Sequence, residues 1–164
     1  MDSRTESNIN SASKSNMTII EHETKFTKIC FICTGNICRS PMAAAVYNKY
    51  GKKYNTAAVS AGLFPEPGAP ITYNAAKVLN NAMIETPAHE ARRISEKIIN
   101  ECSKIIGMTE HHAFILAQMF PSAVHKIGCM PEDISDPYGG SLEEYKECLD
   151  QIISGLKKMF DFIE

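Results

Sequence analysis

The sequence predicts an α/β fold with a single doubly wound, four-stranded parallel sheet and helices on both faces. From Lys28 onward, short apolar runs alternate with segments of helical spacing, a pattern typical of parallel strands joined by crossover helices. The first run, KICFIC at residues 28–33, is apolar at almost every position. This composition is expected of a strand covered on both faces. Ligands of such sheets bind where the strands end, so the segment after residue 33 is the first place to search for a site.

The helix after the first strand is predicted to start at Ser40-Pro41, with Ser40 as its N-cap and Pro41 in the first helical position. Gly51 is predicted to end it. Thr109 is a candidate cap for a later helix. The other predicted strands are 56–62, 103–108 and 124–130, and the other predicted helices are 71–81, 94–101, 109–120 and 141–160.

Residues 1–25 are predicted to form a disordered tail, and residues 26–164 to form the domain. The tail is rich in Ser, Asn, Thr and charge and has little to bury. It lacks the apolar segment of a secretory signal, and no apolar run approaches the length of a membrane span. A formal net charge of −2 provides no basic field for nucleic acid. We therefore expect a cytoplasmic monomer without membrane or nucleic-acid partners.

Three of the six cysteines, Cys30, Cys33 and Cys38, lie within nine residues. In a reducing compartment, clustered thiols are more often catalytic or metal-binding than paired in disulfides. The spacing of Cys30 and Cys33 suits zinc or redox chemistry, but a strand would point the two side chains in different directions. No metal or organic cofactor is expected. The scattered cysteines, Cys102, Cys129 and Cys148, are predicted to be small buried apolar residues.

The octet CTGNICRS, residues 33–40, lies at the predicted junction of strand and helix. Backbone N–H groups of such a turn attract phosphate. Gly35 would allow the backbone to approach a ligand closely, and Asn36 tolerates a left-handed conformation. Arg39 can grip two phosphate oxygens with its planar fork. These groups would also stabilise Cys33 as a thiolate beneath the phosphate, which makes it a nucleophile aimed at phosphorus.

A thiolate that attacks a phosphate ester needs an acid to protonate the leaving group and later a base to activate water. Asp136, in the SDPYGG segment after the last predicted strand, is the candidate for both roles. Tyr138 would form an aromatic wall beside it. The GxxxxGK[ST] pattern of nucleotide-triphosphate loops is absent from the octet.

With CTGNICRSP, SAG at residues 60–62 and DPY at residues 136–138, the chain resembles the low-molecular-weight protein-tyrosine phosphatases from about Lys28 to Phe160. The resemblance implies that Cys33 becomes a phosphocysteine, Arg39 binds the phosphate, and Asp136 is the general acid and base. It also implies that Cys38 can form a protective disulfide with Cys33. The residues implied around the phosphoryl group are Thr34, Gly35, Asn36, Ile37, Cys38, Ser40 and Tyr138, and those implied to hold the loop in shape are Asn36, Ser40 and Ser60.

Two features leave the substrate open between phosphotyrosine and phosphoarginine in a protein. The GGS after Tyr138, together with SAGLFPEPG and MTEHH, is similar to the bacterial protein-arginine phosphatases. That branch tends to carry Thr at the position of Ile37, and Ile favours an aromatic ring. We therefore favour phosphotyrosine and keep phosphoarginine as the alternative.

Two other functions are disfavoured. An arsenate reductase would need cysteines after the third strand, where the sequence is GMTEHHAF. A non-catalytic phosphate-binding module would need neither Cys33 nor Asp136.

Three further side chains are given positions by the sequence. His111 and His112 are adjacent in a predicted helix, so their side chains point about 100° apart around its axis. This makes them poor joint ligands of one metal ion. We predict that they lie in solvent at the start of the helix. Phe64 follows the second strand and is predicted either to wall the pocket or to anchor the loop in the core.

Overall fold

The computed structural model describes residues 27–86 and 88–162; the tail predicted at 1–25 lies outside them. The described residues contain one four-stranded parallel sheet, in the order β2-β1-β3-β4. The strands are β1 (Thr27–Cys33), β2 (Thr56–Gly62), β3 (Cys102–Gly107) and β4 (Ile127–Cys129). The predicted parallel sheet is confirmed.

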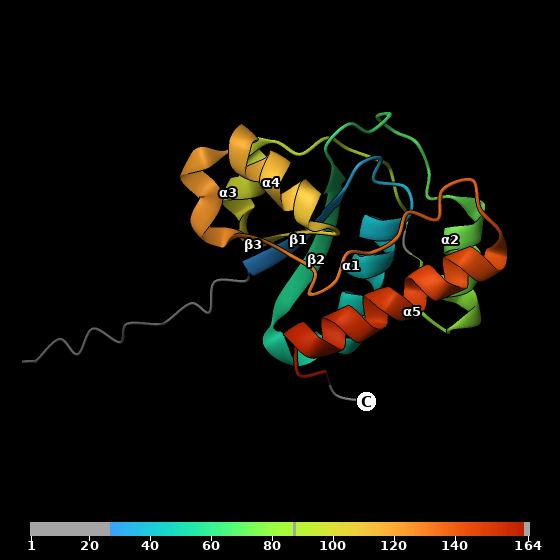
Figure 1. Ribbon diagram of the computed structural model, residues 1–164. Coiled ribbons are helices and arrows are strands. Elements are labelled where there is room, and N and C mark those ends of the chain that lie inside the picture. The colour runs from blue at the N-terminus through green and yellow to red at the C-terminus, as the bar shows by residue number, and fades with distance from the viewer. Residues whose placement is uncertain (1–26, 87, 163–164) are drawn as a thin grey trace, which may run out of the picture.

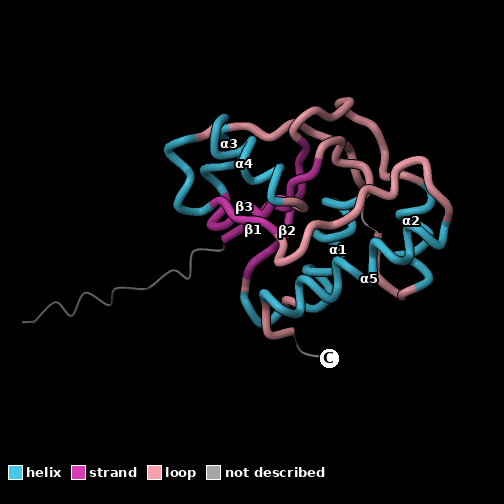
Figure 2. Tube along the Cα trace, viewed as in Figure 1, coloured by secondary structure: helices cyan, strands magenta, loops and turns pink. Residues whose placement is uncertain are grey.

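Five α-helices within the described residues cover both faces of the sheet (Figures 1 and 2). On one face lie α1 (Arg39–Tyr50), α2 (Tyr73–Asn81) and α5 (Leu142–Met159), and on the other lie α3 (Glu96–Glu101) and α4 (Glu110–Met119). Short 3-10 turns at Lys52–Tyr54 and Pro121–Lys126 complete the connections. The doubly wound arrangement is therefore as predicted.

Successive residues of β1 enter two separate hydrophobic cores, which explains its nearly continuous apolar sequence. Phe31 and Cys33 belong to the core shared with α1, α2 and α5, whereas Cys30 and Ile32 belong to the core under α3 and α4. Cys30 and Cys33 thus point to opposite faces of the sheet, as the strand geometry predicted. Full burial of a side chain such as Phe31 is worth about 2–3 kcal/mol, so the centre of the sheet is strongly held.

The predicted capping role of Ser40 is wrong. Helix α1 begins at Arg39, its N-cap is Cys38, and no side chain caps it. Ser40 is fully buried inside the first turn, where its hydroxyl serves other partners. The predicted end of α1 at Gly51 is confirmed, and so is the cap at Thr109, whose hydroxyl accepts the backbone N–H of His112 at 3.2 Å.

Other predicted boundaries shift by a few residues. The strand predicted at 124–130 is only Ile127–Cys129, because Pro121 starts a 3-10 turn that continues to Lys126. The helix predicted at 71–81 starts at Tyr73, and that predicted at 94–101 starts at Glu96. Among the scattered cysteines, Cys102 and Cys148 are buried as predicted, whereas Cys129 is only half-buried.

Helix α5 carries a complete capping box at its N-terminus. The Ser141 hydroxyl accepts the N–H of Glu144 at 3.3 Å, and the Glu144 carboxylate accepts the N–H of Ser141 at 2.6 Å. This pair satisfies two backbone donors that the helix itself leaves free. It fixes the point at which the chain leaves the loop at residues 130–141 and enters the helix.

The sheet order locates the functional region. The chain runs from β1 to β2 on one side of β1 and then crosses to β3 on the other. In open α/β sheets this reversal opens a crevice at the carboxyl ends of the strands. The loop at residues 33–39 therefore lies between segments that follow β2, β3 and β4.

Candidate active site

The loop between β1 and α1 turns around Asn36. Asn36 is fully buried and has φ of +56°, the left-handed conformation that the sequence predicted. Its side-chain amide donates to the hydroxyls of Ser40 and Ser60, both at 2.9 Å. Its side-chain carbonyl accepts the backbone N–H of Arg92 at 3.0 Å. Asn36 thus joins the loop to α1 and β2 and to the segment that precedes α3.

His89 and Arg92 also support the loop, and neither was predicted from the sequence. The His89 ring nitrogen Nε2 lies 2.6 Å from the Asn36 carbonyl oxygen, and Arg92 also donates from Nε to the Ser60 carbonyl at 3.1 Å. Both residues lie in a stretch without regular secondary structure. No periodic pattern or spacing relative to the loop could have indicated these contacts.

Gly62, the last residue of the SAG motif, lets β2 approach the loop. A Cβ atom at this position would lie 2.7 Å from the Thr34 carbonyl oxygen and 3.0 Å from the Asn36 Cβ. By contrast, a Cβ at Gly35 would meet only Ile37, at an ordinary 3.7 Å. Packing inside the protein thus requires glycine at residue 62 but not at residue 35.

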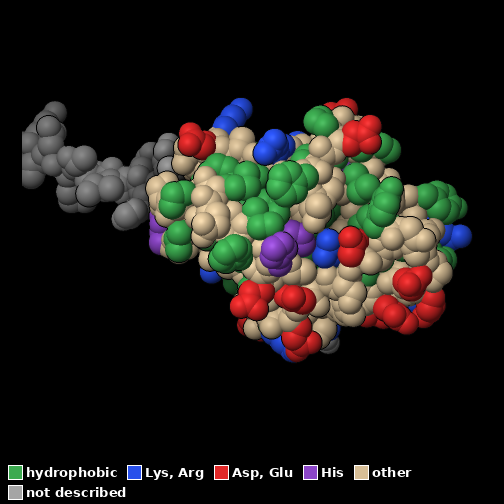
Figure 3. Space-filling view, turned by 45° about the horizontal axis from the view of Figure 1, so that its top comes forward, with side chains coloured by type: hydrophobic (Ala, Val, Ile, Leu, Met, Phe, Trp, Pro, Cys, Tyr) green, Lys and Arg blue, Asp and Glu red, His purple; other side chains and the backbone are tan. Residues whose placement is uncertain are grey.

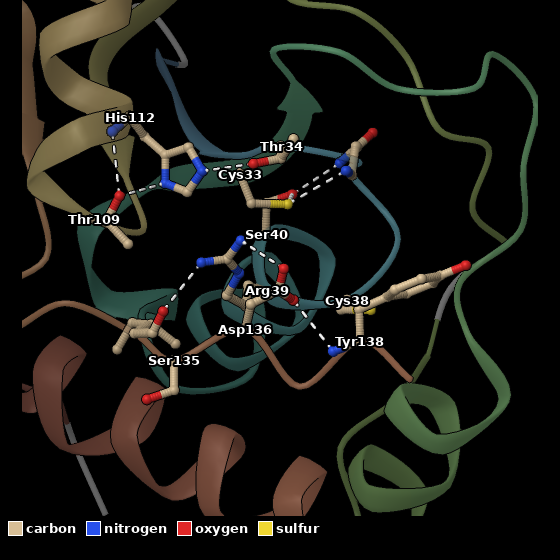
Figure 4. Close-up of polar contacts among 12 residues, drawn as sticks. Cys33, Thr34, Cys38, Arg39, Ser40, Thr109, His112, Ser135, Asp136 and Tyr138 are labelled. Carbon is tan, nitrogen blue, oxygen red and sulfur yellow. Dashed lines mark hydrogen bonds and ion pairs between the residues drawn. The ribbon is translucent and has the colours of Figure 1, made fainter. Parts of the chain in front are cut away.

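Cys33 lies at the end of β1 and is almost fully buried. Its Sγ is 3.0 Å from the Ser40 hydroxyl oxygen and accepts the backbone N–H of Asn36 at 3.3 Å. Figure 4 shows the sulfur facing the space occupied by the side chains of Arg39 and Asp136. The sulfur thus lies against a hydroxyl and a backbone N–H at the end of β1.

Arg39 and Asp136 come together from positions far apart in the sequence. The buried Arg39 guanidinium donates from Nη1 to the Ile134 carbonyl at 3.1 Å, and its Nη2 lies 3.4 Å from the Asp136 carboxylate (Figure 4). The Asp136 carboxylate also accepts the backbone N–H of Tyr138 at 3.2 Å, as in an Asx turn. The loop after β4 is therefore tied to the loop after β1.

A cavity of about 200 Å³ opens above Cys33. It is lined by eight residues, all of them among those predicted from the sequence: Cys33, Thr34, Gly35, Ile37, Cys38, Arg39, Asp136 and Tyr138. The side chains of Asn36, Ser40 and Ser60 do not line it, because they are buried behind the loop. The predicted set thus divides into a wall around the cavity and a support beneath it.

Tyr138 lies at the mouth of this cavity and is 69% exposed. Phe64 occupies neither of its predicted positions. It is 61% exposed, so it does not anchor the loop in the core, and it does not line the cavity. The Arg93 guanidinium instead lies 5.9 Å from the centre of its ring.

The Cys38 thiol has two hydroxyl partners. Its Sγ lies 3.2 Å from the Tyr145 hydroxyl and 3.5 Å from that of Thr72. Burial raises the pKa of the Cys38 thiol, against the opposing effect of these two hydroxyls. Burial and the bond to Cys38 raise the pKa of Tyr145 to about 12. Cys38 is therefore a protonated, hydrogen-bonded thiol at neutral pH.

The prediction of a solvated histidine pair is wrong for one member. His111 is exposed, but His112 is only 4% exposed and points toward the loop (Figure 4). Its Nε2 lies 3.0 Å from the Thr34 hydroxyl, and its Nδ1 lies 2.8 Å from the Thr109 hydroxyl. Helix α4 starts beside the loop. His111 therefore faces solvent, whereas His112, the next residue, faces the loop.

The side-chain types on the face shown in Figure 3 are unevenly distributed. Hydrophobic side chains are common over its upper part, acidic ones gather along its lower edge, and the basic ones are dispersed. This face therefore offers no continuous basic surface.

The sequence model described as low molecular weight phosphotyrosine protein phosphatase matches residues 28–164. The chain belongs to this family. As a member it is a cysteine-based phosphatase that acts on phosphorylated proteins.

Similar members of the family carry two kinds of name. A protein-arginine-phosphatase of Geobacillus stearothermophilus is 34% identical over 133 residues, 76% of this chain and 88% of that protein. The low molecular weight protein-tyrosine-phosphatase PtpB of Staphylococcus haemolyticus is 30% identical over 141 residues, 80% of this chain and 96% of that protein. Among solved structures, the low molecular weight protein tyrosine phosphatase from T. tengcongensis is 30% identical, with a TM-score of 0.78 over 82% of this chain and 98% of that one. The fold is thus shared with a solved tyrosine phosphatase of the family, and sequence relatives of both names lie within it.

Proposed function

We propose that this phosphatase hydrolyses phosphotyrosine in proteins through a phosphocysteine on Cys33. The observation that carries the proposal is the cavity of about 200 Å³ above the Cys33 sulfur, with Ile37 and Tyr138 in its walls. A flat aromatic ring can pack between an aliphatic and an aromatic side chain, while its phosphate reaches the loop. Neither Ile37 nor Tyr138 carries a charge that would pair with a guanidinium, and the carboxylate in the wall, Asp136, is assigned to proton transfer.

In the first step, the Cys33 thiolate attacks phosphorus, and the bond from phosphorus to the tyrosine oxygen breaks. Asp136 donates its proton to that leaving oxygen. The Arg39 guanidinium and the loop N–H groups stabilise the charge on the transferring phosphoryl group. The link from Arg39 to the Ile134 carbonyl holds the guanidinium in place at the edge of the cavity.

In the second step, water replaces the cysteine on phosphorus. The Asp136 carboxylate takes a proton from the attacking water, the phosphorus–sulfur bond breaks, and inorganic phosphate leaves. The departing thiolate regains the two contacts that it has in the free protein, to the Ser40 hydroxyl at 3.0 Å and the Asn36 N–H at 3.3 Å. Its release is thereby eased.

A second candidate substrate is phosphoarginine in a protein. It is favoured by DPYGGS at residues 136–141 and by the 34% identity to a protein-arginine-phosphatase. The nucleophile, the phosphate-binding arginine and the acid would keep their roles. We place it second because Ile37 lines the cavity itself.

The test compares phosphate release from a phosphotyrosine peptide and a phosphoarginine peptide, with Cys33→Ser as the inactive control. We expect faster release from phosphotyrosine, abolished in Cys33→Ser. The variants Ile37→Thr and Ile37→Val introduce side chains of nearly the same size, which differ in one hydroxyl group. Only the Thr variant should shift the substrate preference toward phosphoarginine. Faster phosphoarginine turnover by the wild type would establish the second candidate, and no turnover of either would leave a phosphate-binding module.

We also propose that the protein acts as a cytoplasmic monomer without membrane or nucleic-acid partners. Within residues 27–86 and 88–162, no helix is long and apolar enough to cross a membrane. The dispersed basic side chains in Figure 3 do not favour nucleic acid. Light scattering during size-exclusion chromatography would test the monomer, whose expected mass is 18.1 kDa.

A further inference from the structure

The buried His112 lies beside the reactive loop without lining the cavity. It follows β3, and its ring spans the gap between Thr109 on its own helix and Thr34 next to the nucleophile. Gly107 makes room for it, because a Cβ at that residue would lie 3.0 Å from the His112 Cβ. The fold therefore brings a histidine to the loop where the mechanism above gives it no task.

His112 is uncharged at neutral pH. Burial, and to a lesser degree the Arg39 and His111 charges, lowers its pKa to about 4. A neutral imidazole donates from one ring nitrogen and accepts at the other. The Thr109 hydroxyl already accepts the His112 backbone N–H, so its own proton can be donated to Nδ1. We therefore assign the ring proton to Nε2, from which it is donated to the Thr34 hydroxyl.

Thr34 is exposed at the edge of the cavity, so its side chain is not fixed by burial in the core. The hydrogen bond to His112 fixes it instead. Its carbonyl accepts the backbone N–H of Phe64 at 3.0 Å, and the carbonyl of Cys33 accepts that of Leu63 at 3.0 Å. The backbone on this side of the loop is thus held by the segment after β2. The Thr34 side chain is held by His112 in α4, the helix that follows β3.

We propose that His112 is a positioning residue of this phosphatase, which fixes Thr34 and thereby aims the loop's backbone N–H groups at the phosphoryl group during transfer. The inference rests on the proposed phosphocysteine mechanism, but it holds for a phosphotyrosine or a phosphoarginine substrate. His112 does not touch the substrate. Its contribution is to keep the donors in the geometry that the transition state requires, so that none is gained or lost during reaction.

The two ring nitrogens allow a matched pair of variants. The amide of Gln can reach the position of Nε2 and bond to Thr34, whereas the amide of Asn can replace only the Nδ1 contact to Thr109. His111→Ala is the control for removal of a neighbouring exposed ring. We expect His112→Asn to lower kcat by about tenfold, the factor expected for one buried hydrogen bond, and His112→Gln to stay within about threefold of the wild type. KM should change little.

A second readout separates positioning from general stability. Vanadate adopts the shape of the phosphoryl group in transit, and inorganic phosphate that of the product. Isothermal titration of His112→Asn should show vanadate affinity reduced about tenfold and phosphate affinity nearly unchanged. If both fall together with the melting temperature, the role is merely structural and the proposal is overturned.

The coupling to Thr34 is tested with Thr34→Val, which removes the hydroxyl and keeps the shape. If His112 acts through Thr34, the double variant with His112→Asn should be no slower than the slower single variant. Multiplied losses would overturn the proposal, and so would equal activities of the Asn and Gln variants. Absence of turnover in the wild type, with vanadate still bound, would refute the proposed function instead.

Discussion

The neutral, buried His112 predicts a specific loss of stability in mild acid. The ordinary pKa of the imidazole is 6.5, and in the folded protein it is lowered to about 4. Between these values the unfolded chain binds a proton that the folded protein does not, so the stabilising contribution is present above pH 6.5 and is lost as the pH falls. For this single group the free energy of unfolding falls by about 2 kcal/mol between pH 7 and pH 5.

The measurement is urea denaturation of the wild type and of His112→Gln at both pH values, followed by circular dichroism. All other titrating groups are common to the two proteins, so the difference between their pH dependences isolates His112. The wild type should lose about 2 kcal/mol more than the variant over this range. If the two lose the same free energy, the histidine is not held neutral in the folded protein, and the assignment of its proton to Nε2 fails with it.

Three further predictions concern the acid, the loop contact and the helix cap. Asp136→Asn should lower kcat about a hundredfold for a phenyl phosphate with a basic leaving group, and much less for a p-nitrophenyl ester; equal losses would remove the acid role. Gly62→Ala should cost about 1–3 kcal/mol of stability in thermal unfolding and lower kcat, because its Cβ would lie 2.7 Å from the Thr34 carbonyl oxygen; unchanged activity would show that the loop tolerates displacement. Ser141→Ala should cost about 1 kcal/mol by breaking the capping box with Glu144, and a fall in kcat at saturating substrate would contradict its purely structural role.

Much of the fold could be predicted because its signals are local. The apolar run of β1 reflects two cores, and the stop at Gly51 and the cap at Thr109 each depend on one turn of chain. The start of α1 was misplaced because Ser-Pro is a common helix start. Here the Ser40 hydroxyl is used by Asn36 and Cys33 instead.

The residues that line the cavity could be predicted from the sequence, but not all of those that support the loop beneath it. Residues 33–39 are contiguous, and Asp136 has a distinctive neighbour in Pro137, so both can be recognised in a single sequence. His89 and His112 are separated from their loop partners by 53 and 78 residues. Two adjacent histidines at a helix start predicted solvent for His112, and only the tertiary structure reveals that its ring turns inward.

The hydrogen bonds of the reactive loop join residues that are far apart in the chain and are therefore made at different times during synthesis. Cys33 is made early, but the partners of its loop are not: Thr34 bonds to a residue 78 positions later, and Arg39 to one 95 positions later. A nascent chain that has emerged only as far as β3 carries Cys33 and Arg39 without Asp136 and without the Ile134 carbonyl to which Arg39 donates. We therefore expect phosphate-transfer activity only after the loop that follows β4 has folded back onto the residues after β1.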